Sequence, residues 1–203
     1  LTLIDPASVS VAAASSYNPC DDAFLTHTAT VLGFNPYGDT SYSDETGTVY
    51  SETDCTLRIS ADGVLTLRNQ DLAPRFTAQS DTDGDCIEYV RSLLDAVAGD
   101  SLGDARLYFT GLERSEGTTT VVFSTYLAGL AVVRSDGPAV QAVFQGATLT
   151  ELTFRIRSYT LSQSETIALM PAAQAAAIAK SGTLLVPAYA DNGETDLTAG
   201  WLR

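Results

Sequence analysis

The sequence predicts an α+β fold of two similar units, in each of which a helix packs on a curved antiparallel sheet. Two observations carry this prediction. Stretches with strand periodicity follow one another directly after each helical stretch, an order that favours antiparallel pairing with helices on one face. Aligning Gly33 with Gly99 superposes the helix that precedes each glycine, with Phe24 on Val90, and a run of strands follows both.

An arm and the first of these units are expected in the first 80 residues. Residues 1–19 are small, polar and unpatterned, which is typical of a linker or flexible arm. The first α+β unit is expected over residues 20–80. Its helix begins at Asp21 and Asp22, whose carboxylates can cap backbone amides, and ends before Gly33.

The rest of the first unit is predicted to be sheet. The apolar face of its helix would be formed by Phe24, Val31 and Leu32. Two strands alternate apolar and polar residues, and a three-residue turn that contains Gly63 joins them into a hairpin. The expected strands are 46–51, 55–60 and 64–69.

The second α+β unit is expected over residues 81–203. Ile87, Val90, Leu94 and Val97 form a helical stripe, so a helix is predicted from about Asp83 to Gly99. A third helix starts at Met170-Pro171 and ends at Gly182, and an Asn-Gly step joins the last two strands. The expected strands are 105–114, 118–127, 130–134, 139–145, 149–159, 183–190 and 195–202.

Composition excludes several classes of protein. The 203 residues include 25 acidic and 11 basic side chains, for a net charge of −14. Nucleic acids and anionic membranes bind clusters of Lys and Arg, so this charge argues against both as partners. Hydrophobic residues make up 45% of the chain, so it can bury a core. No stretch approaches the roughly 18 apolar residues of a membrane span. We therefore expect a folded domain that prefers basic partners.

The N-terminus and the cysteines bear on the cellular compartment. The chain opens with Leu1, so we expect that a signal or membrane anchor has been cut away. Cys20, Cys55 and Cys86 contain no C-x-x-C pair. They are either three reduced thiols or, in an exported protein, one disulfide and one thiol, in which case Cys20 and Cys86 are the favoured pair.

Two candidate sites for chemistry have structural explanations. His27 is the single histidine, belongs to no catalytic motif and lies about two helical turns from Cys20, so we expect an exposed helical histidine. The run Asp81–Asp85 resembles a calcium loop, but Gly84 is fourth in place of sixth and Ser92 stands where the loop needs Glu. A helix cap is expected there, and adventitious calcium binding stays open.

The remaining acidic and glycine clusters are also expected to have structural roles and not to form a catalytic or binding site. Asp44-Glu45 and the run from Asp191 to Asp196 lie on expected loops, where solvated charges are the ordinary case and a glycosidase pair would need a cleft. Gly111, Gly117 and Gly129 are expected in strands and turns, not in a phosphate cradle. The sequence therefore predicts no catalytic, cofactor-binding or metal-binding residues and no cofactor.

Tyr126, Gly129 and Val132 form a Y-x-x-G-x-x-V pattern in the second half of the chain. With this pattern the second half resembles the YycH/YycI-type and PepSY-like extracytoplasmic domains of Gram-positive bacteria, which have a Tyr, a Gly and a small apolar residue at these places, although Ala131 replaces the usual Pro. Tyr189 and Trp201 stand where the closing strands of the family have theirs. The resemblance covers about residues 84–203 and implies a PepSY/cystatin-like unit, with Tyr126, Tyr189 and Trp201 packed between helix and sheet.

The resemblance implies a function as well as a fold. Its members restrain the sensor kinase of a cell-wall two-component system or modulate peptidases. We therefore expect a non-enzymatic, extracytoplasmic, membrane-anchored or secreted domain that binds a sensor kinase or a peptidase. The membrane is expected to be reached only through an anchor before Leu1. The alternatives are a peptidase-inhibitor or propeptide-like module and a hydrolase acting on envelope substrates.

Overall fold

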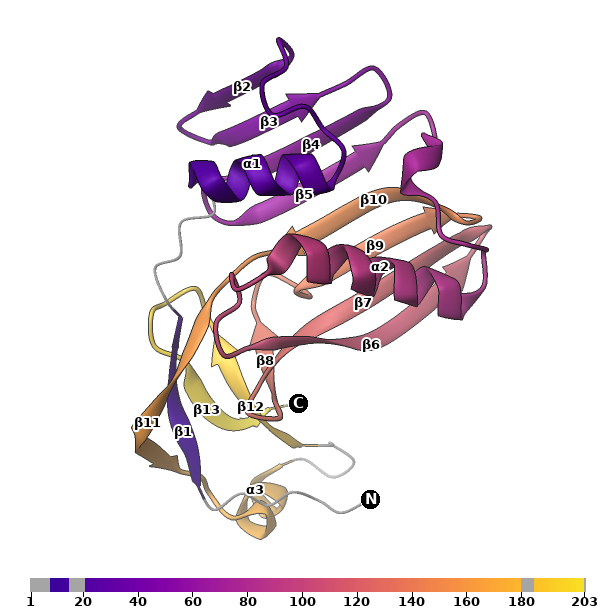
Figure 1. Cartoon of the computed structure of the whole chain (residues 1–203). Coiled ribbons are helices and arrows are strands. Elements are labelled where there is room, and N and C mark those ends of the chain that lie inside the picture. Colours follow the sequence, from indigo (N-terminus) through magenta and orange to yellow (C-terminus); the bar gives the residue numbers. More distant parts are fainter. Residues whose placement is uncertain (1–7, 15–20, 180–184, 203) are drawn as a thin grey trace.

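The protein folds mainly as sheet. The structure, a computed structural model, describes residues 8–14, 21–179 and 185–202. Of these residues, 49% lie in strands and 20% in helices. Eleven strands form one mixed sheet with the order β13-β12-β8-β7-β9-β10-β5-β4-β3-β2, and β6 pairs with β7 outside this path (Figure 1). The prediction of two helix-on-sheet units is therefore wrong, because the fold is β-rich and its main sheet is continuous.

The elements have the following bounds. The helices are α1 (Asp22–Val31), α2 (Asp83–Ala98) and α3 (Ala172–Ile178), with a 3-10 turn at Pro74–Phe76. The strands are β1 (Ser8–Ala14), β2 (Ser41–Asp44), β3 (Gly47–Ser51), β4 (Cys55–Ser60), β5 (Val64–Asn69), β6 (Arg106–Ser115), β7 (Thr118–Leu127), β8 (Leu130–Arg134), β9 (Val140–Gln145), β10 (Thr148–Arg155), β11 (Tyr159–Ala168), β12 (Val186–Asp191) and β13 (Thr198–Leu202).

The pairing of β5 with β10 joins the two predicted units. Five antiparallel residue pairs run from Arg68 opposite Glu151 to Val64 opposite Arg155. This pairing crosses the boundary expected between residues 80 and 81. A separate sheet in each unit would leave the facing edges of β5 and β10 without partners, whereas the pairing satisfies the backbone groups of both edges.

Helices α1 and α2 lie over the same face of the main sheet (Figure 1). The stripe predicted for α2 is confirmed, since Val90, Leu94 and Val97 are buried. The face predicted for α1 is confirmed in part, since Leu32 is buried and Phe24 packs against the core. Val31 is instead 39% exposed, and Leu25 and Ala29 are buried. Both helices cover one contiguous hydrophobic core on this face of the sheet.

The hairpin of β4 and β5 has the predicted bounds, and alternate residues of both strands are fully buried. The same alternation continues through β7, where Phe123 is buried and Tyr126 is only half-buried. One face of these strands therefore packs against the helices, and the other face is open to solvent, as is common in antiparallel sheets.

The C-terminal lobe departs furthest from the prediction. The expected strand 149–159 is interrupted after Arg155, and Tyr159 begins the separate strand β11. β11 pairs with β1, so Ser8–Ala14 of the expected arm form a strand. β12 runs parallel to β8 and antiparallel to β13. α3 ends at Ile178, earlier than the expected end at Gly182, which itself lies outside the described residues.

Candidate functional site

A polar cluster, the Asp191 junction, joins β12 to the rest of the molecule. It consists of buried Asp191 and Tyr159, the largely buried Arg134 and Arg157, and the half-exposed Asp136. Asp191 is only 3% exposed. The Tyr159 hydroxyl donates to its Oδ2 at 2.7 Å, and the Arg157 Nε lies 3.3 Å from the same oxygen. Burial, followed by the hydrogen bond to Asp191, raises the pKa of Tyr159, so this hydroxyl stays protonated and acts as a donor.

Arg134 connects the two carboxylates of the junction. Its guanidinium donates to both oxygens of Asp136, at 2.9 and 2.7 Å, and to the Tyr159 hydroxyl at 3.3 Å. The hydrogen bonds from Arg134 hold the pKa of Asp136 below its usual value. Because each charged group is turned toward another group of the cluster, the junction holds strands together and exposes little to a ligand.

The expectation of solvated charges is therefore wrong for Asp191. A signal did exist in the sequence: Arg134, Arg155 and Arg157 lie in or beside predicted strands, and arginines buried in a sheet require acidic partners. The partner could not be identified, because the parallel pairing of β8 with β12 brings Asp191 opposite Arg134.

The second notable region is the outer strand β6. It pairs with β7 from Arg106 to Ser115, with one irregularity between Phe109 and Gly111. Among the described residues, no strand pairs with its other edge. Tyr108 is 56% exposed and Phe109 is 40% exposed. A strand of ten residues with exposed aromatic side chains and one unpaired edge has the features of a protein-binding surface.

The aromatic side chains of β6 are held in place from both faces of the sheet. Phe109 packs edge-on against Phe123 at 6.0 Å between ring centroids, on the face that the helices cover. Tyr108 packs edge-on against Tyr126 at 5.2 Å, on the opposite face. Such fixed, partly exposed aromatic rings lose little conformational entropy when a partner covers them.

The helix-facing side of β6 leaves part of the core uncovered. Leu107 and Leu112 of β6 are only partly buried, and both pack against the core. Tyr89 lies on the other side of α2, where its ring packs edge-on against Phe144 of β9 and burial raises its pKa to about 12. We call Leu107, Tyr108, Phe109 and Leu112 the β6 margin.

A hollow of about 390 Å³ lies at the start of the β6 margin, between the end of α2 and the beginning of β6. Leu94, Ala98 and Leu107 contribute apolar lining, and Asp95 and Asp100 contribute carboxylates. Its size is within the range of pockets that accept a small ligand or a side chain.

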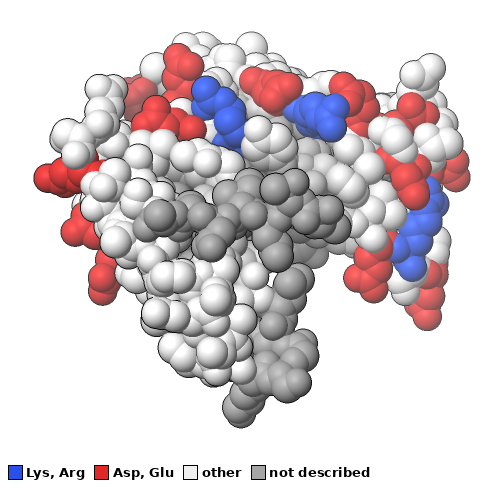
Figure 2. All heavy atoms as spheres, turned by 90° about the horizontal axis from the view of Figure 1, so that it is seen from below, with Lys and Arg blue, Asp and Glu red and all other residues white. Residues whose placement is uncertain are grey.

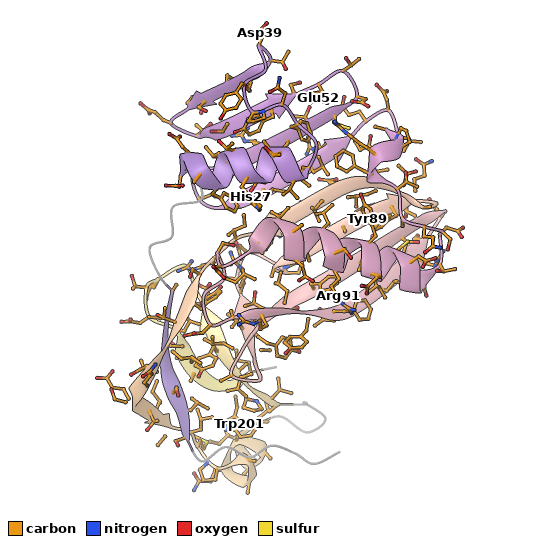
Figure 3. The ribbon with its side chains drawn as sticks, viewed as in Figure 1. His27, Asp39, Glu52, Tyr89, Arg91 and Trp201 are labelled. Atoms are coloured by element: carbon orange, nitrogen blue, oxygen red, sulfur yellow. The ribbon has the colours of Figure 1, made fainter. Side chains whose placement is uncertain are left out.

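His27 is exposed on α1, as expected (Figure 3). Its Nε2 donates to the main-chain oxygen of Ala96 on α2, at 2.9 Å. The contact links the middle of α1 to the C-terminal end of α2.

The thiols of Cys55 and Cys86 are buried and unbridged, and Cys20 lies outside the described residues. Cys86, the favoured partner of Cys20 in a disulfide, is thus a free thiol. Burial raises the pKa of both thiols, which disfavours the nucleophilic thiolate at neutral pH.

The acidic run at the start of α2 is a helix cap, as predicted. The Thr82 side chain accepts from the backbone amide of Asp85, and Asp83 forms a 2.7 Å ion pair with Arg114. Asp44 accepts from the amide and the hydroxyl of Thr46 in the turn after β2. Within the described ranges, no group of three or more metal-binding side chains occurs.

The three aromatic residues of the family resemblance lie in different surroundings. Tyr189 is fully buried and donates to the main-chain oxygen of Ser10 in β1. Trp201 donates to the main-chain oxygen of Met170, beside α3 (Figure 3). Tyr126 lies on the sheet face opposite Phe123, so the expected packing between helix and sheet is wrong for Tyr126.

The lower end of the molecule differs from its rim in charge. Figure 2 shows acidic and a few basic side chains along the outer part of this view, and white, uncharged residues beside those drawn in grey. The sequences of β1, α3 and β13 contain no charged residue. Trp201, Met170 and Ile178 line an apolar hollow of about 420 Å³ there.

No family model, no curated protein and no solved structure matches the chain. Among the described residues, no helix is long and apolar enough to cross a membrane. The β6 margin and the Asp191 junction are therefore interpreted from their own geometry.

Proposed function

We propose that the protein is a non-enzymatic, extracytoplasmic protein-binding domain that regulates the sensor kinase of a cell-envelope signalling system. The observation that carries this proposal is the β6 margin, where a strand edge that pairs with no other described strand coincides with exposed aromatic side chains. An exposed edge of this kind is an aggregation hazard unless a partner covers it.

The sequence resemblance supports the choice of a kinase regulator. The residues on which it rests form β7, the turn at Ala128 and Gly129, and β8. Both turn residues have positive φ, at 49° and 82°, which explains a glycine at position 129. Tyr126 of the same stretch contacts Tyr108, so the pattern extends to the β6 margin.

Site-specific photocrosslinking in the source cells, with the full-length protein, tests this proposal. A photoreactive amino acid replaces Tyr108 on β6 or, as a matched control, Tyr42 on β2. The two tyrosines are 56% and 59% exposed, and each lies on an outer strand of the main sheet. We expect a crosslink to a membrane-bound sensor kinase, or to its accessory protein, from position 108 and none from position 42.

Three outcomes contradict the proposal. A secreted peptidase crosslinked at position 108 indicates the peptidase-inhibitor module. Equal crosslinking from both positions shows that the β6 margin is not the contact. Cell-wall fragments alone, followed by turnover of an envelope substrate that is lost on mutation of an acidic pair, indicate the hydrolase.

A further inference from the structure

We propose that the partner contributes an extended, cationic segment that adds to the unpaired edge of β6 as a further strand and lies alongside α2. This inference rests on the proposed protein-binding function and names the kind of partner segment and its binding mode. Three features of the β6 margin carry it: its backbone edge, its apolar side chains and its charge.

The backbone edge of β6 is long and poorly guarded. Ten residues of strand span about 33 Å. Natural proteins guard such edges with lysine, proline or bulges, but β6 contains neither Lys nor Pro and has one irregularity, next to Gly111. Its arginines do not guard the edge, because Arg106 donates to Gly103 and Ala105 oxygens and Arg114 binds Asp83.

The apolar side chains of the margin have the spacing that an added strand needs. Leu107, Phe109 and Leu112 lie opposite Thr125, Phe123 and Val121 of β7, whose side chains are all buried on the helix-facing side. Side chains directly opposite in paired strands lie about 4.5–5.5 Å apart. Alternate side chains of an added segment would therefore cover Leu107, Phe109 and Leu112.

The charge of the margin favours a cationic segment. Asp95 and Asp100 line the hollow at the start of β6, and neither carboxylate forms an ion pair with another described residue. Arg106 shares this lining, but its guanidinium is turned to main-chain oxygens. Arg91 on α2 is paired with Glu88 at 2.8 Å (Figure 3). A Lys or Arg side chain of the segment would enter the hollow and place its charge beside Asp95 and Asp100.

The same charges disfavour a second copy of this chain as the occupant. Pairing β6 with β6 of a second molecule would bring together two chains that each carry −14. Like-charged surfaces raise the cost of association, and a basic partner is attracted over a distance set by the salt concentration.

Peptide binding to the purified protein tests this mode. The probe is a fluorescein-labelled nine-residue peptide of alternating Val and Thr with Lys at both ends, and the matched control carries Glu in place of Lys. Fluorescence anisotropy gives the affinity, and hydrogen exchange locates the protected amides. We expect the Lys peptide to bind at least about tenfold more tightly than the Glu peptide and to protect amides within residues 106–115.

Two double variants test whether the preference for the Lys peptide comes from the hollow or from the overall charge of the protein. D95N/D100N should remove most of the preference for the Lys peptide. D39N/D71N removes the same two charges from exposed positions elsewhere and should leave the preference unchanged. Equal affinity for both peptides, protection outside β6, or equal effects of the two double variants would overturn the inference.

Two further results separate this inference from the proposed function. Dimerisation through β6 in sedimentation, with protection of 106–115 in the absence of peptide, would assign the edge to a second copy. A kinase crosslink at position 108 without β6 protection by the Lys peptide would overturn strand addition and leave the kinase-binding function standing.

Discussion

The Asp191 junction and the β6 margin use similar chemical groups in opposite ways. At the junction, Asp191, Arg134 and Tyr159 are turned toward one another and are closed to solvent. At the margin, a strand edge, Phe109 and the carboxylate of Asp95 face outward without a partner strand or ion pair among the described residues. The junction therefore serves folding, whereas the margin is available for binding. Substitutions should therefore separate the two properties.

The largest effect is expected from Asp191→Ala, which leaves buried Arg134 and Arg157 without their shared carboxylate. Breaking one partner of a buried charge cluster costs about 3–5 kcal/mol. Urea unfolding should show this loss, while the folded fraction still binds the Lys peptide. Glu194→Ala, an exposed substitution in the same turn, is the control and should change stability by no more than about 0.5 kcal/mol. A loss as small as that of the control would show that the junction does not stabilise the fold.

A smaller effect is expected from Tyr159→Phe. This change removes the hydroxyl that donates to Asp191 and accepts from Arg134, and it leaves the ring in place. An unsatisfied buried polar group costs about 1–3 kcal/mol. Thermal unfolding gives the size of the effect, and Tyr50→Phe, at a buried tyrosine outside the junction, gives the comparison. Equal losses in the two variants would argue against a special role of the Tyr159 hydroxyl.

The sequence predicted local structure well where local patterns decide it. The hairpin of β4 and β5 and the helix α2 follow from alternation, a helical stripe and turn glycines. The joining of the two predicted units could not be predicted in this way, because the edges of β5 and β10 meet through pairing across more than 80 residues. Antiparallel neighbours in the chain are favoured by short loops, whereas the parallel pairing of β8 and β12 needs a long crossover that no local pattern encodes.

The two notable regions were missed for different physical reasons. Asp191 follows a strand and precedes Asn192-Gly193, so its position resembles an ordinary turn until the tertiary fold buries it. β6 was predicted as a strand, but its outer position depends on the strand order of the whole sheet. Leu107, Tyr108 and Phe109 are consecutive apolar residues, so they break the apolar–polar alternation of a strand that is buried on one face only. This run is the one local sign in the sequence that both faces of β6 carry apolar side chains.

At the β6 margin, Phe109→Ala should reduce binding more than stability. The edge-on pair with Phe123 contributes about 0.5–1.5 kcal/mol beyond its buried area. We expect a modest fall in the urea midpoint and a loss of most of the affinity for the Lys peptide. Tyr42→Ala on β2 is the control at the opposite end of the sheet and should leave peptide binding unchanged. Unchanged binding in the Phe109 variant would remove the functional distinction between the margin and the junction.

The smallest effect concerns Asp136, at the exposed side of the junction. Because the hydrogen bonds from Arg134 lower its folded-state pKa below the unfolded value of about 3.9, its stabilising contribution is present above that pH. The contribution is lost as the pH falls through the lowered folded-state pKa. Asp136 is half-exposed, so solvent screening limits the contribution to about 1 kcal/mol or less. Asp136→Asn should therefore be slightly less stable than the parent protein at pH 7, and the difference should vanish in strong acid, as urea unfolding across pH would show. A difference that persists with equal size at the lowest pH would mean that Arg134 stabilises the fold through Asp191 and Tyr159 and not through the charge of Asp136.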